Sequence, residues 1–147
     1  MRNGTYSFWG FQLESGSTAT QFTTATGTIQ GELAACQRYY WRNTPNLQYK
    51  PISPMGYAGS STSFAVNFFN PVPMRIPPYT IDFANLYAHQ VAPNAADATI
   101  TSISFLFSDT FCALCSFNVA SGLTTANYGV VNTALASGAY LGFGAEL

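Results

Sequence analysis

The chain has 147 residues, the length of one ordinary domain, and leaves no room for a second full domain. Its 5 basic and 6 acidic residues give a net charge of -1, and only 7% of its side chains are charged, far below the roughly 25% of an average soluble domain. Without a basic cluster it has nothing to neutralise phosphates or anionic headgroups, which argues against a nucleic acid or an anionic membrane surface as a partner.

The composition favours contacts with other proteins. Aromatic residues make up 16% of the chain, more than one modest core requires, and a neutral, aromatic-rich surface usually lies against another protein. The sequence begins with no signal-peptide pattern and contains no apolar run of about 18 residues, so we expect neither secretion nor membrane insertion. Three cysteines, an odd number, are expected to be free thiols in a protein assembled in a reducing cytoplasm.

The first predicted elements are a strand over residues 5–13 and a linker rich in Ser, Thr, Gly and Ala over residues 15–28. We therefore divide the chain into an N-terminal strand or arm with its linker, residues 1–26, and a β-sandwich domain, residues 27–147. A detached strand cannot satisfy its own backbone groups, so the arm must pair with its own body or with a neighbouring subunit. Its bulky residues are expected to anchor it there: Phe8, Trp9 and Phe11.

One short helix is predicted over residues 28–36. Thr28 is placed to cap its first turn, and Leu33 and Cys36 are expected to face the core. Strands are predicted over residues 37–42, 79–83 and 136–145, with a loop over residues 43–54.

Three further runs alternate apolar residues with small or polar ones, which places one face of each strand in the core. The apolar positions are Phe64, Val66 and Phe68; Ile103, Phe105 and Phe107; and Phe111, Ala113, Cys115, Phe117 and Val119. A tight turn at residues 108–110 is expected to join the last two strands. Together the elements predict an all-β, jelly-roll-like antiparallel β-sandwich with one short helix.

The sequence offers two thiols at the spacing of a zinc or redox pair, Cys112 and Cys115. On a strand, residues three apart point to opposite faces, so the two sulfurs cannot reach one metal ion. We therefore expect no metal site and interpret both as buried small hydrophobic residues.

Candidate catalytic groups are equally sparse. His89 is the only histidine, and no Gly-x-Ser-x-Gly elbow accompanies it. A triad with Asp82 or Asp109, or a carboxylate pair of Asp82 with Asp97 or Asp109, requires the fold to bring distant residues together. We expect no catalytic residue and no cofactor.

The densest aromatic and polar patch is Arg38-Tyr39-Tyr40-Trp41-Arg42. In the preferred interpretation it is a strand whose alternate residues, Tyr39 and Trp41, enter the core or a subunit interface, while Arg38 and Arg42 pair elsewhere. The other interpretation is a sugar-binding platform, because aromatic faces stack on pyranose rings and Arg side chains reach their hydroxyls. Tyr39, Tyr40, Trp41 and Arg42 are therefore candidate interface or glycan-binding residues.

Three blocks, in order, resemble the junction and PVPMR segments common in bacteriophage tail-fibre and other virion proteins. They are FQLESGSTATQF at residues 11–22, GELAACQRYY at residues 31–40 and FNPVPMRIPP at residues 69–78. The chain departs from the family pattern at two places, since Gln21 stands where the family has Pro and Thr23 where it commonly has Glu.

The resemblance implies a β-sandwich module of virion fibres, usually trimeric, located where particles meet hosts or where coat proteins need reinforcing. Because the chain encodes neither an attachment region nor a stalk, we expect a non-enzymatic capsid decoration (cement) protein. It would form a homotrimer, bind the major capsid protein or another virion protein, and reside in the virion after assembly in the host bacterial cytoplasm. The alternative is a tail-fibre tip or receptor-binding module that recognises host surface glycans.

Overall fold

Antiparallel strands are the main regular structure of the computed structural model, which describes residues 13, 15–18, 20–21, 26–45, 47–91, 97–134 and 138–146. The chain divides into two compact units, residues 1–35 and residues 36–147. The predicted N-terminal strand lies outside the described residues except for Leu13, and so do its proposed anchors Phe8, Trp9 and Phe11. The arm and its boundary at residue 26 stay predictions.

The predicted short helix is present as α1, Ile29–Gln37. Thr28 caps it as expected, because its Oγ1 accepts a hydrogen bond from the backbone N–H of Gly31 at 3.0 Å. The prediction that Leu33 and Cys36 face the core is wrong: α1 buries none of its residues, Leu33 is 57% exposed and Cys36 is exposed. Periodicity within a short helix cannot supply the tertiary contacts that bury it.

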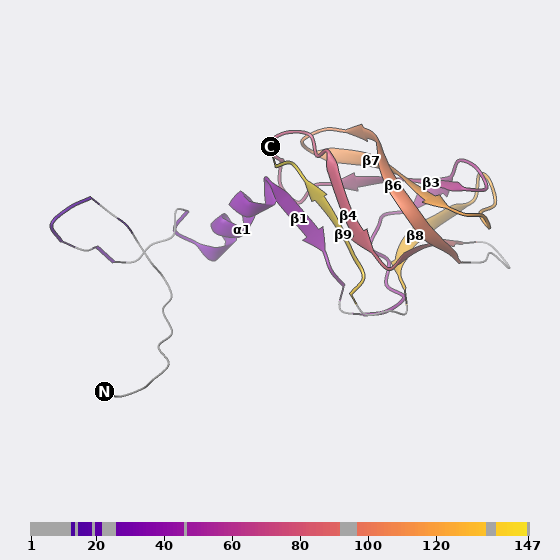
Figure 1. Cartoon of the computed structure of the whole chain (residues 1–147), viewed down its shortest axis with the longest axis horizontal. Coiled ribbons are helices and arrows are strands. Elements are labelled where there is room, and N and C mark those ends of the chain that lie inside the picture. Colours follow the sequence, from indigo (N-terminus) through magenta and orange to yellow (C-terminus); the bar gives the residue numbers. More distant parts are fainter. Residues whose placement is uncertain are drawn as a thin grey trace, which may run out of the picture. The chain divides into compact units, whose positions relative to one another are not determined.

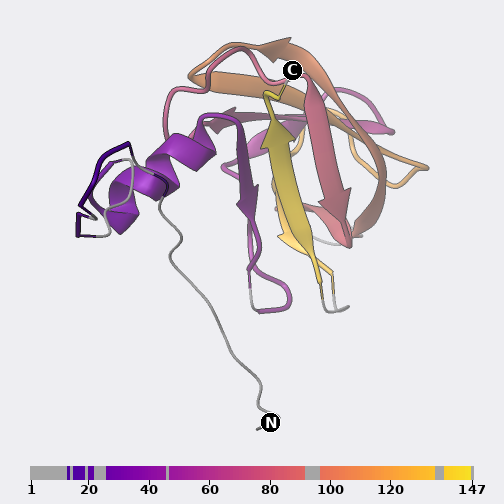
Figure 2. The ribbon, with the colours of Figure 1, turned by 60° about the vertical axis from the view of Figure 1, so that its left-hand side comes forward.

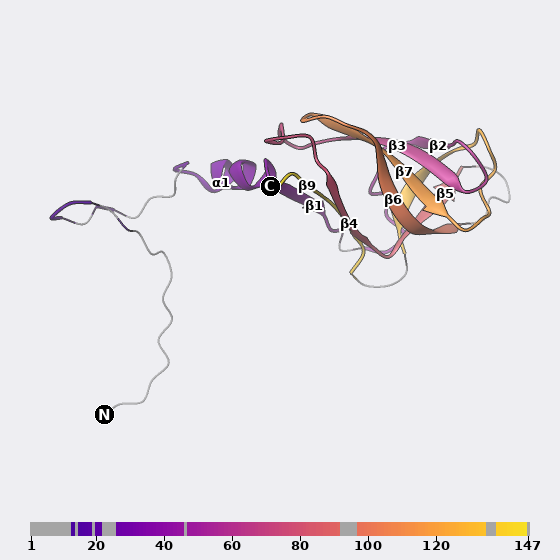
Figure 3. The same ribbon diagram turned by 45° about the horizontal axis from the view of Figure 1, so that its top comes forward.

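The described strands form two antiparallel sheets. They are β1 (Tyr40–Asn43), β2 (Gly56–Ala58), β3 (Ser63–Phe69), β4 (Thr80–Ala84), β5 (Leu86–Gln90), β6 (Ala98–Ser108), β7 (Cys112–Val119), β8 (Tyr128–Thr133) and β9 (Tyr140–Gly144). Six close into a barrel in the order β2-β3-β7-β6-β5-β8, whose strands curl around one another in Figures 1 and 3. The other three form a sheet in the order β1-β9-β4, seen side by side in Figure 2. The predicted all-β antiparallel fold with one short helix is confirmed, and part of its sheet closes on itself.

The pairing of β3 with β7 carries the predicted alternation. Phe64 lies opposite Phe117 and Val66 opposite Cys115, and all four side chains are buried. Every second residue of each strand therefore enters the barrel, because successive side chains of a strand point to opposite faces.

The alternation fails at the end of β6. Ile103 and Phe105 pack against the core as predicted, but the register shifts between Phe105 and Phe107. Such a bulge inserts an extra residue and reverses which side chains face inward. The prediction that Phe107 and Phe111 enter the core is therefore wrong: Phe107 follows the bulge, and Phe111 lies in the turn before β7.

The two sheets share one hydrophobic core, whose centre is Phe143 on β9. Its ring centroid lies 5.0 Å from that of Trp41, 5.5 Å from that of Phe68 and 5.5 Å from that of Phe105. The three-stranded sheet is thus packed on the barrel strands β3 and β6 as the layers of a sandwich are packed on each other.

Candidate functional site

β1 carries most of the aromatic patch that the sequence singles out. α1 continues to Gln37 and closes with a hydrogen bond from the Tyr39 N–H to the Cys36 carbonyl at 3.0 Å, so the strand begins at Tyr40, later than predicted. Tyr39 lies in the turn, is 43% exposed and does not enter the core; its role in a subunit interface stays a prediction. Trp41 packs on the core as expected.

Tyr40 and Arg42 lie on the other face of the three-stranded sheet. We call the group Tyr40, Arg42, Asp82 and Tyr140 the Tyr40 face. The phenol of Tyr40 donates to Asp82 Oδ2 at 3.1 Å, and the phenol of Tyr140 donates to Asp82 Oδ1 at 3.2 Å. The Arg42 guanidinium lies 3.5 Å from the centroid of the Tyr140 ring, a cation–π contact. One carboxylate therefore links side chains from all three strands.

Glycines on β9 form the floor of the Tyr40 face. A Cβ atom at Gly142 would lie 2.6 Å from the Tyr40 hydroxyl oxygen, and one at Gly144 would lie 3.7 Å from Tyr40 Cδ2. The group nearest to Gly142 is the Tyr40 hydroxyl, and the group nearest to Gly144 is the Thr80 hydroxyl. Burial, and then the hydrogen bond to Asp82, raise the pKa of Tyr40, so its phenol stays a donor at neutral pH.

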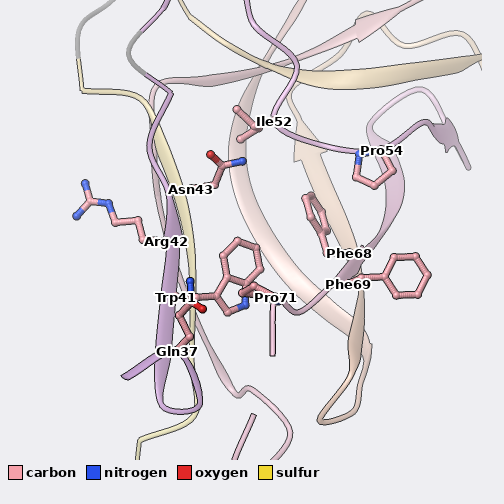
Figure 4. Close-up of a pocket in the computed structure, with 9 residues that line it drawn as sticks. All are labelled: Gln37, Trp41, Arg42, Asn43, Ile52, Pro54, Phe68, Phe69 and Pro71. Atoms are coloured by element: carbon pink, nitrogen blue, oxygen red, sulfur yellow. The ribbon is translucent and has the colours of Figure 1, made fainter. Parts of the chain in front are cut away.

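The opposite face of β1 borders an open pocket of about 400 Å³, shown in Figure 4. Its lining residues are Gln37, Trp41, Arg42, Asn43, Ile52, Pro54, Phe68, Phe69 and Pro71. The indole N–H of Trp41 donates to Asn70 Oδ1 at 3.0 Å, and Asn70 Nδ2 donates to the Thr110 carbonyl at 2.9 Å. In Figure 4 the Trp41 ring lies on the side of Phe68 and Pro71, while the Arg42 side chain extends away from them.

Large apolar side chains gather where β3, β6 and β7 meet at one end of the barrel. We define the hairpin patch as Phe69, Leu106, Phe107 and Phe111, which are 72%, 60%, 57% and 62% exposed. Phe69 lies opposite the first residue of β7, and the Asn70 N–H donates to the Phe111 carbonyl at 2.8 Å. The patch was missed because the sequence placed two of its members in the core.

The titratable groups weighed as catalytic candidates have other partners in the structure than those a triad or an acid pair would need. His89 Nδ1 lies 2.6 Å from Asp97 Oδ1, and both side chains are exposed. No hydrogen bond joins the other ring nitrogen of His89 to a hydroxyl or thiol in the described part of the chain. Asp109 accepts the backbone N–H of Phe111 at 2.9 Å in the turn before β7, and Asp82 binds the two phenols. The fold brings none of the predicted acid pairs or triads into hydrogen-bond contact within these residues.

The two closely spaced thiols lie on opposite faces of β7. Cys115 is fully buried, and burial raises its pKa to about 12, whereas Cys112 is only partly buried on the outer side. Among the described residues, no three His, Cys, Asp or Glu side chains are grouped closely enough to hold a metal ion.

The described part of the chain contains no helix with the length and apolar composition that a membrane span requires. In comparisons with known proteins, no family model, no curated protein and no solved structure matches the chain.

Proposed function

We propose that the chain is a non-enzymatic structural protein of a bacteriophage particle, acting as a capsid decoration (cement) protein. It forms homotrimers and binds the major capsid protein or another virion protein. The observation that carries this proposal is the hairpin patch, whose four side chains are each more than half exposed on adjacent strands and their connecting turn. A monomer rarely leaves such a group facing water, since burying one large apolar side chain contributes about 1.5–3 kcal/mol.

The scarcity of charge supports the same function. Between described residues the structure has a single contact with the geometry of an ion pair, His89 with Asp97, and it is charged only when the histidine is protonated. Apart from that histidine, the whole chain carries only 11 charged side chains at neutral pH, 5 basic and 6 acidic. Contacts made by such a surface are apolar and hydrogen-bonded, and screening by salt leaves them almost unchanged. The three sequence blocks that resemble virion proteins point to the particle as the place where these contacts form.

The test is binding to purified particles of the phage that encodes the chain. We expect the protein to sediment with the heads at both 0.1 M and 1 M NaCl, conditions whose screening lengths are about 10 Å and 3 Å. Replacing Phe69, Phe107 and Phe111 with Ser should reduce the bound fraction at least tenfold. Tyr128→Ser is the matched control, because this exposed tyrosine is on β8, across the barrel from β7 in strand order. Release at modest salt, or equal losses in both variants, would contradict the proposal.

A second candidate function, recognition of host glycans by a tail-fibre tip, is favoured by the Tyr40 face. Its aromatic rings, guanidinium and carboxylate lie together on one side of a sheet, and such groups bind the apolar faces and hydroxyls of sugars. A glycan array should then show binding that Tyr40→Ala abolishes and Tyr128→Ala preserves, with both variants folded. Silence across a broad array would count against this function.

A further inference from the structure

The backbone of β1 has one satisfied side and one open side. Among the strands of the described residues, β1 is an edge strand that pairs with β9 alone. The Ala145 N–H donates to the Tyr39 carbonyl, and the register from this pair places the next hydrogen-bonded residues of β1 at Trp41 and Asn43. Hydrogen-bonded and non-hydrogen-bonded residues alternate along an antiparallel pair.

Tyr40 and Arg42 therefore direct their backbone N–H and C=O groups away from β9. In the described part of the chain no hydrogen bond is formed by these four groups. Arg38, on the same side, does have a partner, since its carbonyl accepts the Arg75 N–H at 2.8 Å. The open edge therefore begins after Arg38. The free N–H and C=O groups of Tyr40 lie about 7 Å from those of Arg42, which is the spacing of two residues along a strand. Another β-strand matches that spacing.

The pocket lies beside this open edge. Trp41, Arg42 and Asn43 line it from β1, and Phe68, Phe69 and Pro71 are among the residues that line it from the barrel side. The one charged lining side chain, Arg42, is engaged with the Tyr140 ring on the other face of the sheet. β1 contains no Lys or Pro, the residues that commonly protect an edge from pairing. A strand added here would direct alternate side chains into an uncharged, largely apolar space.

We propose that the β1 edge binds residues 5–13 of a second copy of the chain as an added strand. This segment, TYSFWGFQL, lies outside the described residues except for Leu13 and contains no charged residue and no proline. On an added strand its Trp9 and Phe11 would share one face and could enter the pocket, while Phe8 would lie on the other face. The composition of the segment matches a pocket that offers aromatic rings, prolines and uncharged amides. The inference rests on the proposed function, because it specifies how copies of the decoration protein associate. Each copy gives one strand and receives one, so the contact is head-to-tail, and the homotrimer of the proposed function requires that it close as a ring.

A complementation experiment on the full chain tests this. Arg42→Pro removes an N–H that faces the open edge, and Arg42→Ala is the matched control that keeps this N–H without the guanidinium. The segment variant replaces Phe8, Trp9 and Phe11 with Ser. In sedimentation equilibrium, we expect wild type and Arg42→Ala to associate, and Arg42→Pro and the segment variant each to show a Kd raised at least tenfold. An equimolar mixture of these two variants should form one-to-one heterodimers, because each supplies the half that the other lacks.

Two results would overturn the inference: a wild-type protein that is monomeric because its segment docks on its own body, or folded variants that fail to combine. A synthetic peptide of residues 5–13 keeps the test decisive if Arg42→Pro does not fold. Labelled with a fluorophore, it should bind the segment variant, lose at least tenfold in affinity when alternate backbone nitrogens on one side are methylated, and tolerate methylation on the other side. No binding, or equal effects on both sides, would contradict strand addition.

The two proposals fail in different ways. Complementation in solution by a chain that is absent from particles would reject the decoration function and keep the strand exchange. Salt-resistant binding of Arg42→Pro to heads, without complementation, would reject the strand exchange and keep the function.

Discussion

The buried amide of Gln90 provides the sharpest test of how the barrel is held together. Gln90 ends β5 and is 2% exposed. Its Nε2 donates to the Thr124 carbonyl at 2.9 Å, and the Thr124 N–H donates to its Oε1 at 2.8 Å. The side chain therefore takes the place of a strand's backbone and fixes the segment between β7 and β8 to the barrel.

Gln90→Leu removes both protein partners of the Thr124 backbone groups. Thr124 is itself exposed, so water can replace the lost partners, and each hydrogen bond counts at its net contribution of about 0.5–1.5 kcal/mol. The two bonds together contribute about 1–3 kcal/mol, and the added apolar burial of Leu returns about 1 kcal/mol. We therefore expect the free energy of unfolding to fall by up to about 2 kcal/mol, against the roughly 5–15 kcal/mol that stabilises a domain.

In the Gln90→Glu variant, the free energy of unfolding should depend on pH through the new carboxyl group. A protonated glutamic acid offers one donor and one acceptor and can restore both bonds, whereas a carboxylate places negative charge in the barrel against the Thr124 carbonyl. Burial raises the pKa of the new carboxyl above its unfolded value of about 4.3. The variant's stability relative to wild type is therefore best below the unfolded pKa and declines as the pH rises through the folded pKa.

Urea unfolding followed by tryptophan fluorescence at pH 4 and pH 7 measures both effects. Gln48→Leu, at an exposed position, is the control for replacing an amide with an apolar side chain and should change the free energy of unfolding by less than about 0.5 kcal/mol. If Gln90→Leu behaves like this control, or if the deficit of Gln90→Glu is the same at both pH values, the two-bond bridge does not stabilise the fold as argued.

Three further predictions concern other parts of the fold. Burial raises the pKa of Cys115 from 9.0 to about 12. The neutral thiol therefore makes its full contribution to the free energy of unfolding below pH 9, and this contribution is lost as the pH rises toward 12. The loss amounts to roughly 4 kcal/mol, and Cys115→Ala should reduce this pH dependence in alkaline unfolding experiments. Gly129→Ala should destabilise the protein by about 1–3 kcal/mol in urea unfolding, since its Cβ would lie 2.2 Å from a backbone oxygen of β5, whereas Gly59→Ala, whose nearest neighbour would be 3.8 Å away, should be nearly neutral. Asp82→Ala should lower the pKa of Tyr40, measured by ultraviolet titration, because Asp82 contributes to raising it.

The sequence predicts strands well where one face is buried and the other is wet. β3 and β7 satisfy that condition, and their inward residues, from Phe64 to Phe117, are those that alternation selects. β5 does not, because Tyr87 on its outer side is also buried, with the ring of Tyr49 at 6.2 Å. A strand covered on both sides has no period of two to detect, so alternation gives no signal for β5.

The sequence identifies the individual residues of β1 in the candidate site, but it does not identify their partners on the other strands. Strand alternation separates Trp41 from its neighbours on β1, and that separation is found. The partners of Tyr40 come from other strands: Asp82 is 42 positions away in the chain, and Tyr140 is on β9. Which residues meet across a sheet depends on register, and register is set by turns and bulges that a single sequence specifies weakly.

The two sheets offer different groups to a partner: the barrel offers exposed side chains, and the three-stranded sheet offers backbone groups at the edge of β1. Closing the barrel removes its free strand edges, so it can recruit a partner only through side chains, and the bulge before Phe107 turns such side chains outward in the hairpin patch. Within the described part of the chain, the three-stranded sheet keeps a free edge at β1, where backbone groups are the available partners. Apolar docking on a virion protein would therefore depend on side chains and strand exchange between copies on backbone groups, and the two contacts share one residue, Phe69, which belongs to the hairpin patch and also lines the pocket.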